Sequence, residues 1–275
     1  MEKYNKVRKT MYSTQLKRWS HFINIKSPYT LVKSIYYMET ASLFLFLTQK
    51  IIKSPNFITF LYAITGVMGA FLLLNPQDEL FYIGIFMVFT KGTFDWADGS
   101  LARRLNKTSF LGFALDEYGA YLSDAAFRVA FIYYTLGYFP ELMYLFPIIA
   151  FILLITKFSL FSDYMYYKNV AYNPLEKYKK VINNEFEEVI KDSKEATGVA
   201  NWYHRYASFL DARARSVDFL LLILIIDRVF DYNLSELLLI LSALIVLRAL
   251  VMYAAGIYSA FKVYKVDEDG LNILK

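Results

Sequence analysis

The sequence predicts an all-α integral membrane protein with six transmembrane helices and an N-terminal amphipathic arm at the membrane interface. Hydrophobic residues make up 57% of its 275 residues and occur in long runs, as is typical of membrane-spanning helices. Basic residues gather in the segments between alternate runs. Three aspartates interrupt the apolar pattern within one short stretch, where a charge is costly unless it serves a site.

The first 55 residues form the predicted arm, which carries ten Lys or Arg against two acidic residues. Lys17, Arg18, Trp19 and Lys26 suit an amphipathic helix lying on anionic lipid. A surface for a protein partner is the plainer interpretation of the same residues. We therefore expect residues 1–55 to be a basic cytoplasmic or interfacial segment.

Residues 56–275 are predicted to form one six-helix domain. The clearest of its apolar segments, residues 56–74, matches the roughly 20 residues that cross a bilayer, and Pro147 predicts a kink in the fourth. The segments are residues 56–74, 80 to beyond 96, 109–136, 141–161, 217–226 and 234–261.

A cytoplasmic insertion, residues 162–215, separates the fourth and fifth predicted spans. It holds nine basic and eight acidic residues, so its charges are mixed in sign. Such a segment is typical of a solvated helical lid or bracket and argues against nucleic-acid binding.

The basic residues also predict the orientation. A cytoplasmic N-terminus places 25 of the 30 Lys and Arg on the cytoplasmic side, whereas the three opposite loops hold Arg228 alone. The positive-inside rule therefore predicts a multi-pass protein with both termini in the cytoplasm. Asp95 and Asp98 then lie near the inner end of the second helix, and Asp116 lies in the early turns of the third.

The spacing of these aspartates suggests a metal site. Asp95 and Asp98 stand at i and i+3, so they share a helix face, and the following turn brings Asp116 opposite them. Oxygen ligands alone suit Mg²⁺, Mn²⁺ or Ca²⁺. Gly99 leaves room for a ligand to approach the backbone, and Arg103 offers a guanidinium to phosphate oxygens. The plainer interpretation is an Asp98–Arg103 ion pair between closely packed helices.

The same stretch resembles the signature of the CDP-alcohol phosphotransferases, also called CDP-alcohol phosphatidyltransferases. That signature is D-x2-D-G-x2-A-R-x8-G-x3-D-x3-D, and seven of its eight positions agree here. The matching residues are Asp95, Asp98, Gly99, Ala102, Arg103, Gly112 and Asp116. The resemblance implies that these aspartates hold two Mg²⁺ or Mn²⁺ ions at the cytoplasmic face. It also implies that the two glycines, Ala102 and Arg103 bind the substrate.

The eighth position of the signature is Ala120 in place of a fourth aspartate. In the family that aspartate is thought to bind the second metal and to deprotonate the acceptor, so the resemblance implies a weakened second site and impaired turnover. Three interpretations stay open: an introduced inactivating substitution, a replacement base such as Asp124 or Glu117, or an inactive member that still binds CDP-lipid. Arg128, four residues after Asp124, offers either an ion pair with that carboxylate or a contact to substrate.

The resemblance implies transfer of a phosphatidyl or related phospho-alcohol group to an alcohol hydroxyl, with release of CMP. The expected donor is a CDP-linked molecule such as CDP-diacylglycerol, and the acceptor is a small alcohol or phospho-alcohol. Membrane lipid is an expected partner, nucleic acid is not, and a homodimer is expected from the family alone. A membrane transporter is the alternative, although its charges more often lie near the bilayer midplane.

Overall fold

The computed structural model describes residues 3–19, 28–75, 77–157, 213–251 and 253–254, and their regular structure is entirely helical. The chain divides into two compact units, Met1–Ala130 and Phe131–Lys275. The predicted insertion at 162–215 lies almost entirely outside the described residues. Lys26 and the chain after residue 254 lie outside them as well.

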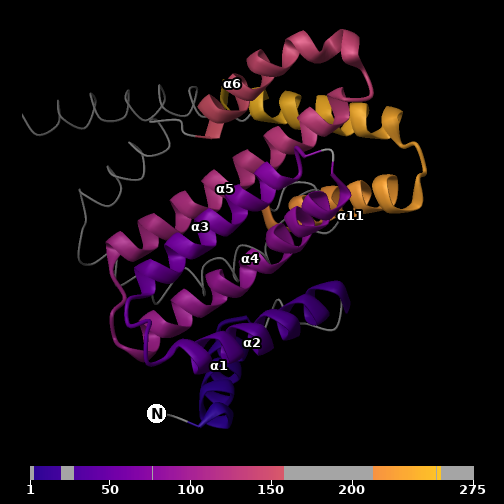
Figure 1. The fold of residues 1–275 in the computed structure, drawn as a ribbon. Helices are drawn as coiled ribbons and strands as arrows, with labels where there is room; N and C mark the ends of the chain where they lie inside the picture. The colour runs from indigo at the N-terminus through magenta and orange to yellow at the C-terminus, as the bar shows by residue number, and fades with distance from the viewer. Residues whose placement is uncertain (1–2, 20–27, 76, 158–212, 252, 255–275) are drawn as a thin grey trace, which may run out of the picture. The chain divides into compact units, whose positions relative to one another are not determined.

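The first unit is built around two closely packed helices, α3 (Pro55–Leu72) and α4 (Asp78–Arg104). Figure 1 shows them side by side. Glycines allow the two backbones to touch, because a Cβ atom on Gly84 would lie 2.8 Å from the carbonyl oxygen of Gly69. Such small-residue contacts are typical of helix packing in membranes.

The turn after α4 reverses the chain into α5 (Phe110–Leu136). Arg103 and Arg104 lie in the last turn of α4, where positive charge suits the helix dipole. Asn106 then adopts a positive φ of 51°, a left-handed conformation that asparagine tolerates. On the far side of the turn, the hydroxyl of Ser109 accepts a hydrogen bond from the N–H of Gly112 at 3.0 Å and so caps the start of α5.

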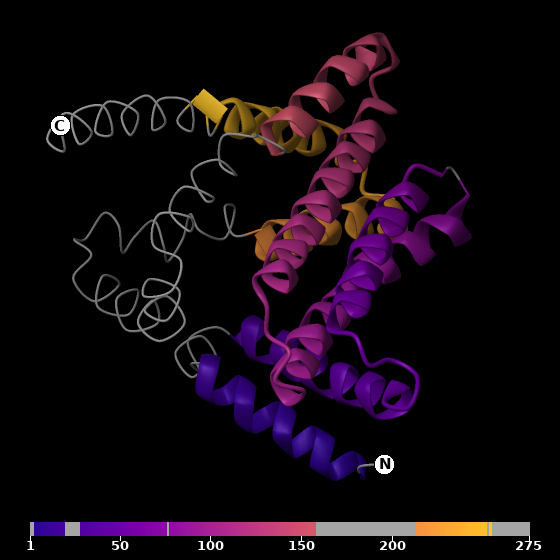
Figure 2. The ribbon, with the colours of Figure 1, turned by 90° about the vertical axis from the view of Figure 1, so that its left-hand side faces the viewer.

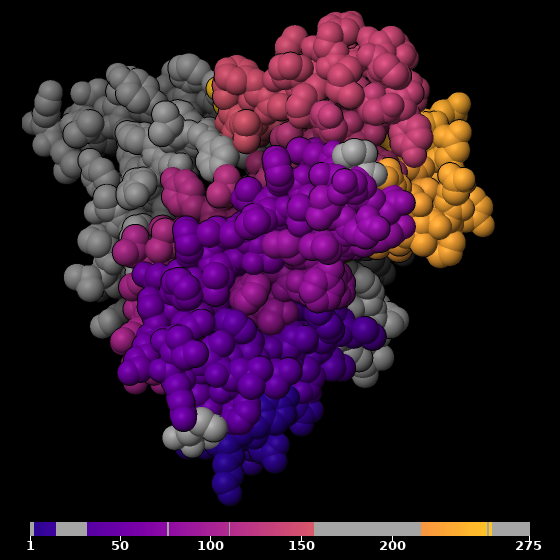
Figure 3. All heavy atoms as spheres, in the orientation of Figure 1, coloured from indigo at the N-terminus to yellow at the C-terminus, as the bar shows by residue number. Residues whose placement is uncertain are grey.

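The N-terminal arm contains two helices, α1 (Tyr4–Trp19) and α2 (Pro28–Thr48), that pack at one end of α4. Figure 2 shows α1 at the end of this unit, and the space-filling view shows its indigo atoms against the violet atoms of the helices that follow (Figure 3). Val7 and Met11 of α1 share a buried cluster with Leu45 of α2 and with Ala97 and Leu101 of α4. The inner face of the arm therefore supports the helix that carries the aspartates.

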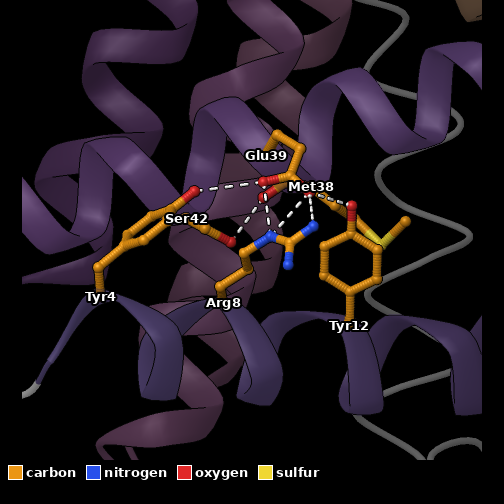
Figure 4. Close-up of polar contacts among 6 residues, drawn as sticks. All are labelled: Tyr4, Arg8, Tyr12, Met38, Glu39 and Ser42. Atoms are coloured by element: carbon orange, nitrogen blue, oxygen red, sulfur yellow. Dashed lines mark hydrogen bonds and ion pairs between the residues drawn. The ribbon is translucent and has the colours of Figure 1, made fainter.

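A polar cluster on the surface fastens α1 to α2 (Figure 4). The guanidinium of Arg8 forms a bidentate ion pair with Glu39, with both Nε contacts at 2.8 Å. The hydroxyls of Tyr4 and Tyr12 donate to the same carboxylate. Arg8 lowers the pKa of Glu39 from 4.5 to about 2, so this carboxylate is ionised at neutral pH.

The second unit contains the end of α5, a 3₁₀ helix η1 (Pro140–Leu145), α6 (Phe146–Lys157), α11 (Arg213–Phe230) and a helix at 235–251. Its buried Asp227 accepts hydrogen bonds of 2.7 Å from the hydroxyls of Tyr134 and Tyr138 and from the N–H of Leu234. The last contact helps to satisfy the backbone at the start of the helix at 235–251.

Helices are present in each of the six segments that were predicted to span the membrane. The described part of the fourth differs from the expected kinked helix. It is divided into η1 and α6, and Pro147 lies at the start of α6, where its missing N–H costs little.

Among the described residues, one helix, α3, is long and apolar enough by itself to cross a membrane, and the apolar stretch Pro140–Thr156 is shorter. The helices α4 and α5 have 27 residues each, but they carry the charges of the aspartate motif. The number of spans therefore stays a prediction.

Candidate active site

Asp98 lies at the centre of the candidate site, on α4 and facing α3. Its side chain is buried, with 5% of the residue exposed, and its Oδ2 accepts a hydrogen bond of 2.5 Å from the hydroxyl of Thr59. The backbone of Gly99 also hydrogen-bonds to this carboxylate. Two neighbours therefore fix the orientation of a carboxylate that would otherwise be costly to bury.

Asp116 of α5 lies close enough to Asp98 to interact with it electrostatically. The turn at 105–109 thus brings together carboxylates from two consecutive helices, as the spacing predicts. Asp95 precedes Asp98 by one turn on α4 and is partly buried. Because like charges repel, a cation between these carboxylates would stabilise the arrangement.

Arg103 folds back along α4 toward the aspartates. A Cβ atom on Gly99 would lie 3.2 Å from one guanidinium nitrogen of Arg103, and Arg103 also interacts electrostatically with Asp98. Gly99 therefore makes room for the arginine, which is a physical reason for a glycine here. Gly112 has a comparable role, since a Cβ atom there would lie 3.3 Å from the side-chain oxygen of Asn56.

Three helices meet beside Ala120. The carbonyl oxygen of Ala120 accepts a hydrogen bond of 3.2 Å from the hydroxyl of Ser123. That hydroxyl accepts in turn from the ammonium of Lys91 at 2.9 Å, and this ammonium lies 5.9 Å from the centre of the Tyr62 ring. We did not single out Lys91 from the sequence, although a lysine one turn before Asp95 inside an apolar run is a visible signal.

Asp124 and Arg128 form a buried ion pair within α5. The Nε of Arg128 donates to Oδ1 of Asp124 at 3.0 Å, and the two side chains are 3% and 2% exposed. The Asp124–Arg128 ion pair, one of the two interpretations suggested by the sequence, is therefore present. Because Asp124 is paired with Arg128, the structure gives no geometric support to Asp124 as a replacement base.

The acidic side chains fit a divalent cation by their chemistry. Asp98 and Asp116 lie close enough to interact electrostatically and offer oxygen ligands alone, which suits Mg²⁺ or Mn²⁺. In the described ranges no three acidic, histidine or cysteine side chains lie close enough to form a ready-made metal site. The structure thus brings two of the three predicted ligands together.

The geometry thus places the buried Asp98, the partly buried Asp116 and Arg103 near one another in a helical protein. Residues 52–182, 131 of the 275 residues, match the family model of the CDP-alcohol phosphatidyltransferases. The family is membrane-embedded, transfers phosphatidyl groups from CDP-alcohols and generally uses divalent metal ions. The match includes α3, α4, α5 and α6 and begins at residue 52, near the end of the arm. Neither the curated proteins nor the solved structures gave a match to the chain.

Proposed function

We propose that the protein transfers a phosphatidyl or related phospho-alcohol group from a CDP-linked donor, such as CDP-diacylglycerol, to an alcohol hydroxyl and releases CMP. The observation that carries this proposal is the pairing of Asp98 with Asp116 beside Arg103, within the region that matches the family. The reaction would take place at the cytoplasmic face, where the positive-inside rule places the C-terminal end of α4.

Asp95, Asp98 and Asp116 would hold Mg²⁺ or Mn²⁺, which when bound neutralises the charge of the donor diphosphate. The hydroxyl of Thr59 donates to Asp98 and holds this carboxylate in one orientation. Arg103, for which Gly99 makes room, supplies a guanidinium for phosphate oxygens, and the small residue Ala102 leaves room for the nucleotide.

Ala120 is expected to limit turnover. In the proposed transfer the hydroxyl oxygen bonds to the lipid-side phosphorus, the bond from that phosphorus to CMP breaks, and the hydroxyl proton must pass to a base. Ala120 offers no such group, and Asp124 is already paired with Arg128. A general base typically adds about 10²- to 10⁴-fold in rate. We therefore propose slow turnover with donor binding retained, and these observations also favour the second candidate, an inactive CDP-lipid-binding member.

Nucleotide binding tests the proposal without requiring turnover. Binding of labelled CMP and CDP-diacylglycerol to the purified protein should depend on Mg²⁺ or Mn²⁺ and should be lost on chelation. Asp98→Asn and Asp116→Asn should abolish the metal-dependent part, whereas Asp78→Asn, at the other end of α4, should leave it unchanged. Binding that ignores both chelator and substitutions would contradict the proposal.

A further inference from the structure

Lys91 is an unusual residue for its position, because it is the middle residue of α4, whose 27 residues run from Asp78 to Arg104. An ammonium at the centre of a membrane helix is costly, so an ionisable residue there is a functional candidate. Lys91 is partly buried.

Two contacts hold the ammonium, and Gly66 makes room for the side chain that carries it. Its Nζ donates to the hydroxyl of Ser123 on α5 at 2.9 Å and lies 5.9 Å from the ring centre of Tyr62 on α3. The Cδ of the lysine lies 3.2 Å from where a Cβ atom on Gly66 would be, so the absence of a side chain at Gly66 makes room for it. The cation is thus held where α3, α4 and α5 meet.

The helix register places this cation beside Ala120. Gly66 lies against Ser123, and Tyr62 lies against Gly119, where a Cβ atom would be 3.3 Å from the Tyr62 ring. The ammonium over Tyr62 is therefore at the level of Gly119 and Ala120. One turn before Tyr62 on α3, the hydroxyl of Thr59 contacts Asp98.

From the middle of α4 toward its C-terminal end, Lys91 comes first, Asp95 and Asp98 follow, and Arg103 comes after them. Cations therefore lie on both sides of the carboxylates. Under the proposed orientation Arg103 is on the cytoplasmic side and Lys91 is on the membrane side. A lipid-linked diphosphate has the same two-sided form, with its nucleotide toward water and its acyl chains toward the bilayer.

We propose that the Lys91 ammonium, held by Ser123 and Tyr62, is a binding site for the lipid-side phosphate of the donor. Arg103 binds the nucleotide side. The inference rests on the proposed function. It identifies Lys91 as a residue that distinguishes lipid-linked donors from free nucleotides. A charge-assisted hydrogen bond to phosphate is among the stronger polar contacts in proteins.

The test compares two ligands on one variant. Lys91→Met should weaken Mg²⁺-dependent binding of CDP-diacylglycerol by about tenfold or more, the typical effect of losing a hydrogen bond to a charged group. It should leave the binding of CMP within about twofold. Lys91→Arg should retain most of the affinity for the lipid donor. Lys33→Met is the matched control, because Lys33 also lies over a tyrosine ring, 5.5 Å from the centre of Tyr37, but on α2.

A second experiment uses the absence of cysteine from the chain. Lys91→Cys gives a single thiol, and its modification with a 2-aminoethyl reagent should restore the lipid-donor affinity, whereas a sulfonatoethyl reagent should not. CDP-diacylglycerol should slow the modification and CMP should not.

Equal loss of both ligands in Lys91→Met, or no loss of either, would overturn the inference while the proposed function stands. If the unaltered protein binds neither ligand with Mg²⁺, the proposed function fails, and the inference fails with it. Retained CMP binding and an unchanged unfolding temperature show that a variant is folded.

Discussion

The hydroxyl of Thr59 on α3 donates a 2.5 Å hydrogen bond to the carboxylate of Asp98 on α4. The two residues are 39 positions apart in the chain, so helix packing alone brings them together. The contact joins the first turns of α3 to the aspartate motif. A residue outside the motif therefore sets the orientation of one of its carboxylates.

Thr59→Val should weaken metal binding at the site. The substitution keeps the shape of the side chain but removes the donor, and partners of metal-ligating groups typically contribute 10- to 100-fold in affinity. We expect a shift of about tenfold in the Mg²⁺ concentration that supports CMP binding, measured by titration. Thr90→Val is the control, because the Thr90 hydroxyl donates to the backbone of Phe86 within α4. Equal titration curves for the two variants would contradict this role.

Gly66→Ala should destabilise the protein. A Cβ atom at this position would lie 2.3 Å from the Cβ of Ser123, so α3 and α5 would have to separate. Overpacking typically costs about 1–3 kcal/mol, which exceeds the gain of up to about 1 kcal/mol from alanine in a helix. Thermal unfolding in detergent measures the effect. Gly119→Ala, with its nearest neighbours at 3.3 Å, should be milder, and equal effects would contradict the close approach at Gly66.

The packing of α1 on α2 should not change between pH 8 and pH 5 and should weaken in acid. The folded-state pKa of Glu39 is lowered from 4.5 to about 2 by Arg8, so its stabilising effect is fully present above pH 4.5 and is lost as the pH falls toward 2. Hydrogen exchange of the α1 amides measures it. Glu39→Gln should raise exchange above pH 4.5, where the carboxylate acts, and exchange that rises already between pH 8 and pH 6 would contradict the assignment.

Arg128→Met should destabilise the protein strongly, because it leaves the buried carboxylate of Asp124 without the guanidinium at 3.0 Å. Breaking a buried pair typically costs about 3–5 kcal/mol, whereas replacing both partners by apolar residues costs much less. The double variant Asp124→Leu with Arg128→Met should therefore recover most of the stability in denaturant unfolding. If the double variant loses as much stability as Arg128→Met and Asp124→Leu lose together, the pair is not the main interaction of either residue.

The sequence predicted the part of the site that depends on neighbouring helices. Asp98 and Asp116 lie on consecutive helices joined by a short turn, so their spacing was enough to expect that they lie near each other. The helical ranges of α3, α4 and α5 also agree with the apolar segments to within a few residues, except where α4 continues to Arg104.

The remaining features depend on contacts between distant segments. Val7 and Met11 look unremarkable in a basic arm, and their burial against Leu101 follows from how α1 and α2 pack on α4. The contact from Thr59 to Asp98 and the path of Lys91 toward Tyr62 follow from the register of α3 against its neighbours. No local spacing rule predicts such a register.

The most direct measurement is Mg²⁺-dependent release of CMP from CDP-diacylglycerol with a panel of small alcohols and phospho-alcohols, made on this protein and on Ala120→Asp in parallel. We expect slow or no release by the present chain and release at least about 10²-fold faster by Ala120→Asp, since position 120 then supplies the missing carboxylate. Equal release by the two proteins would show that position 120 is not the site of the base. No release by either, together with no binding of CMP, would contradict the phosphotransferase function itself.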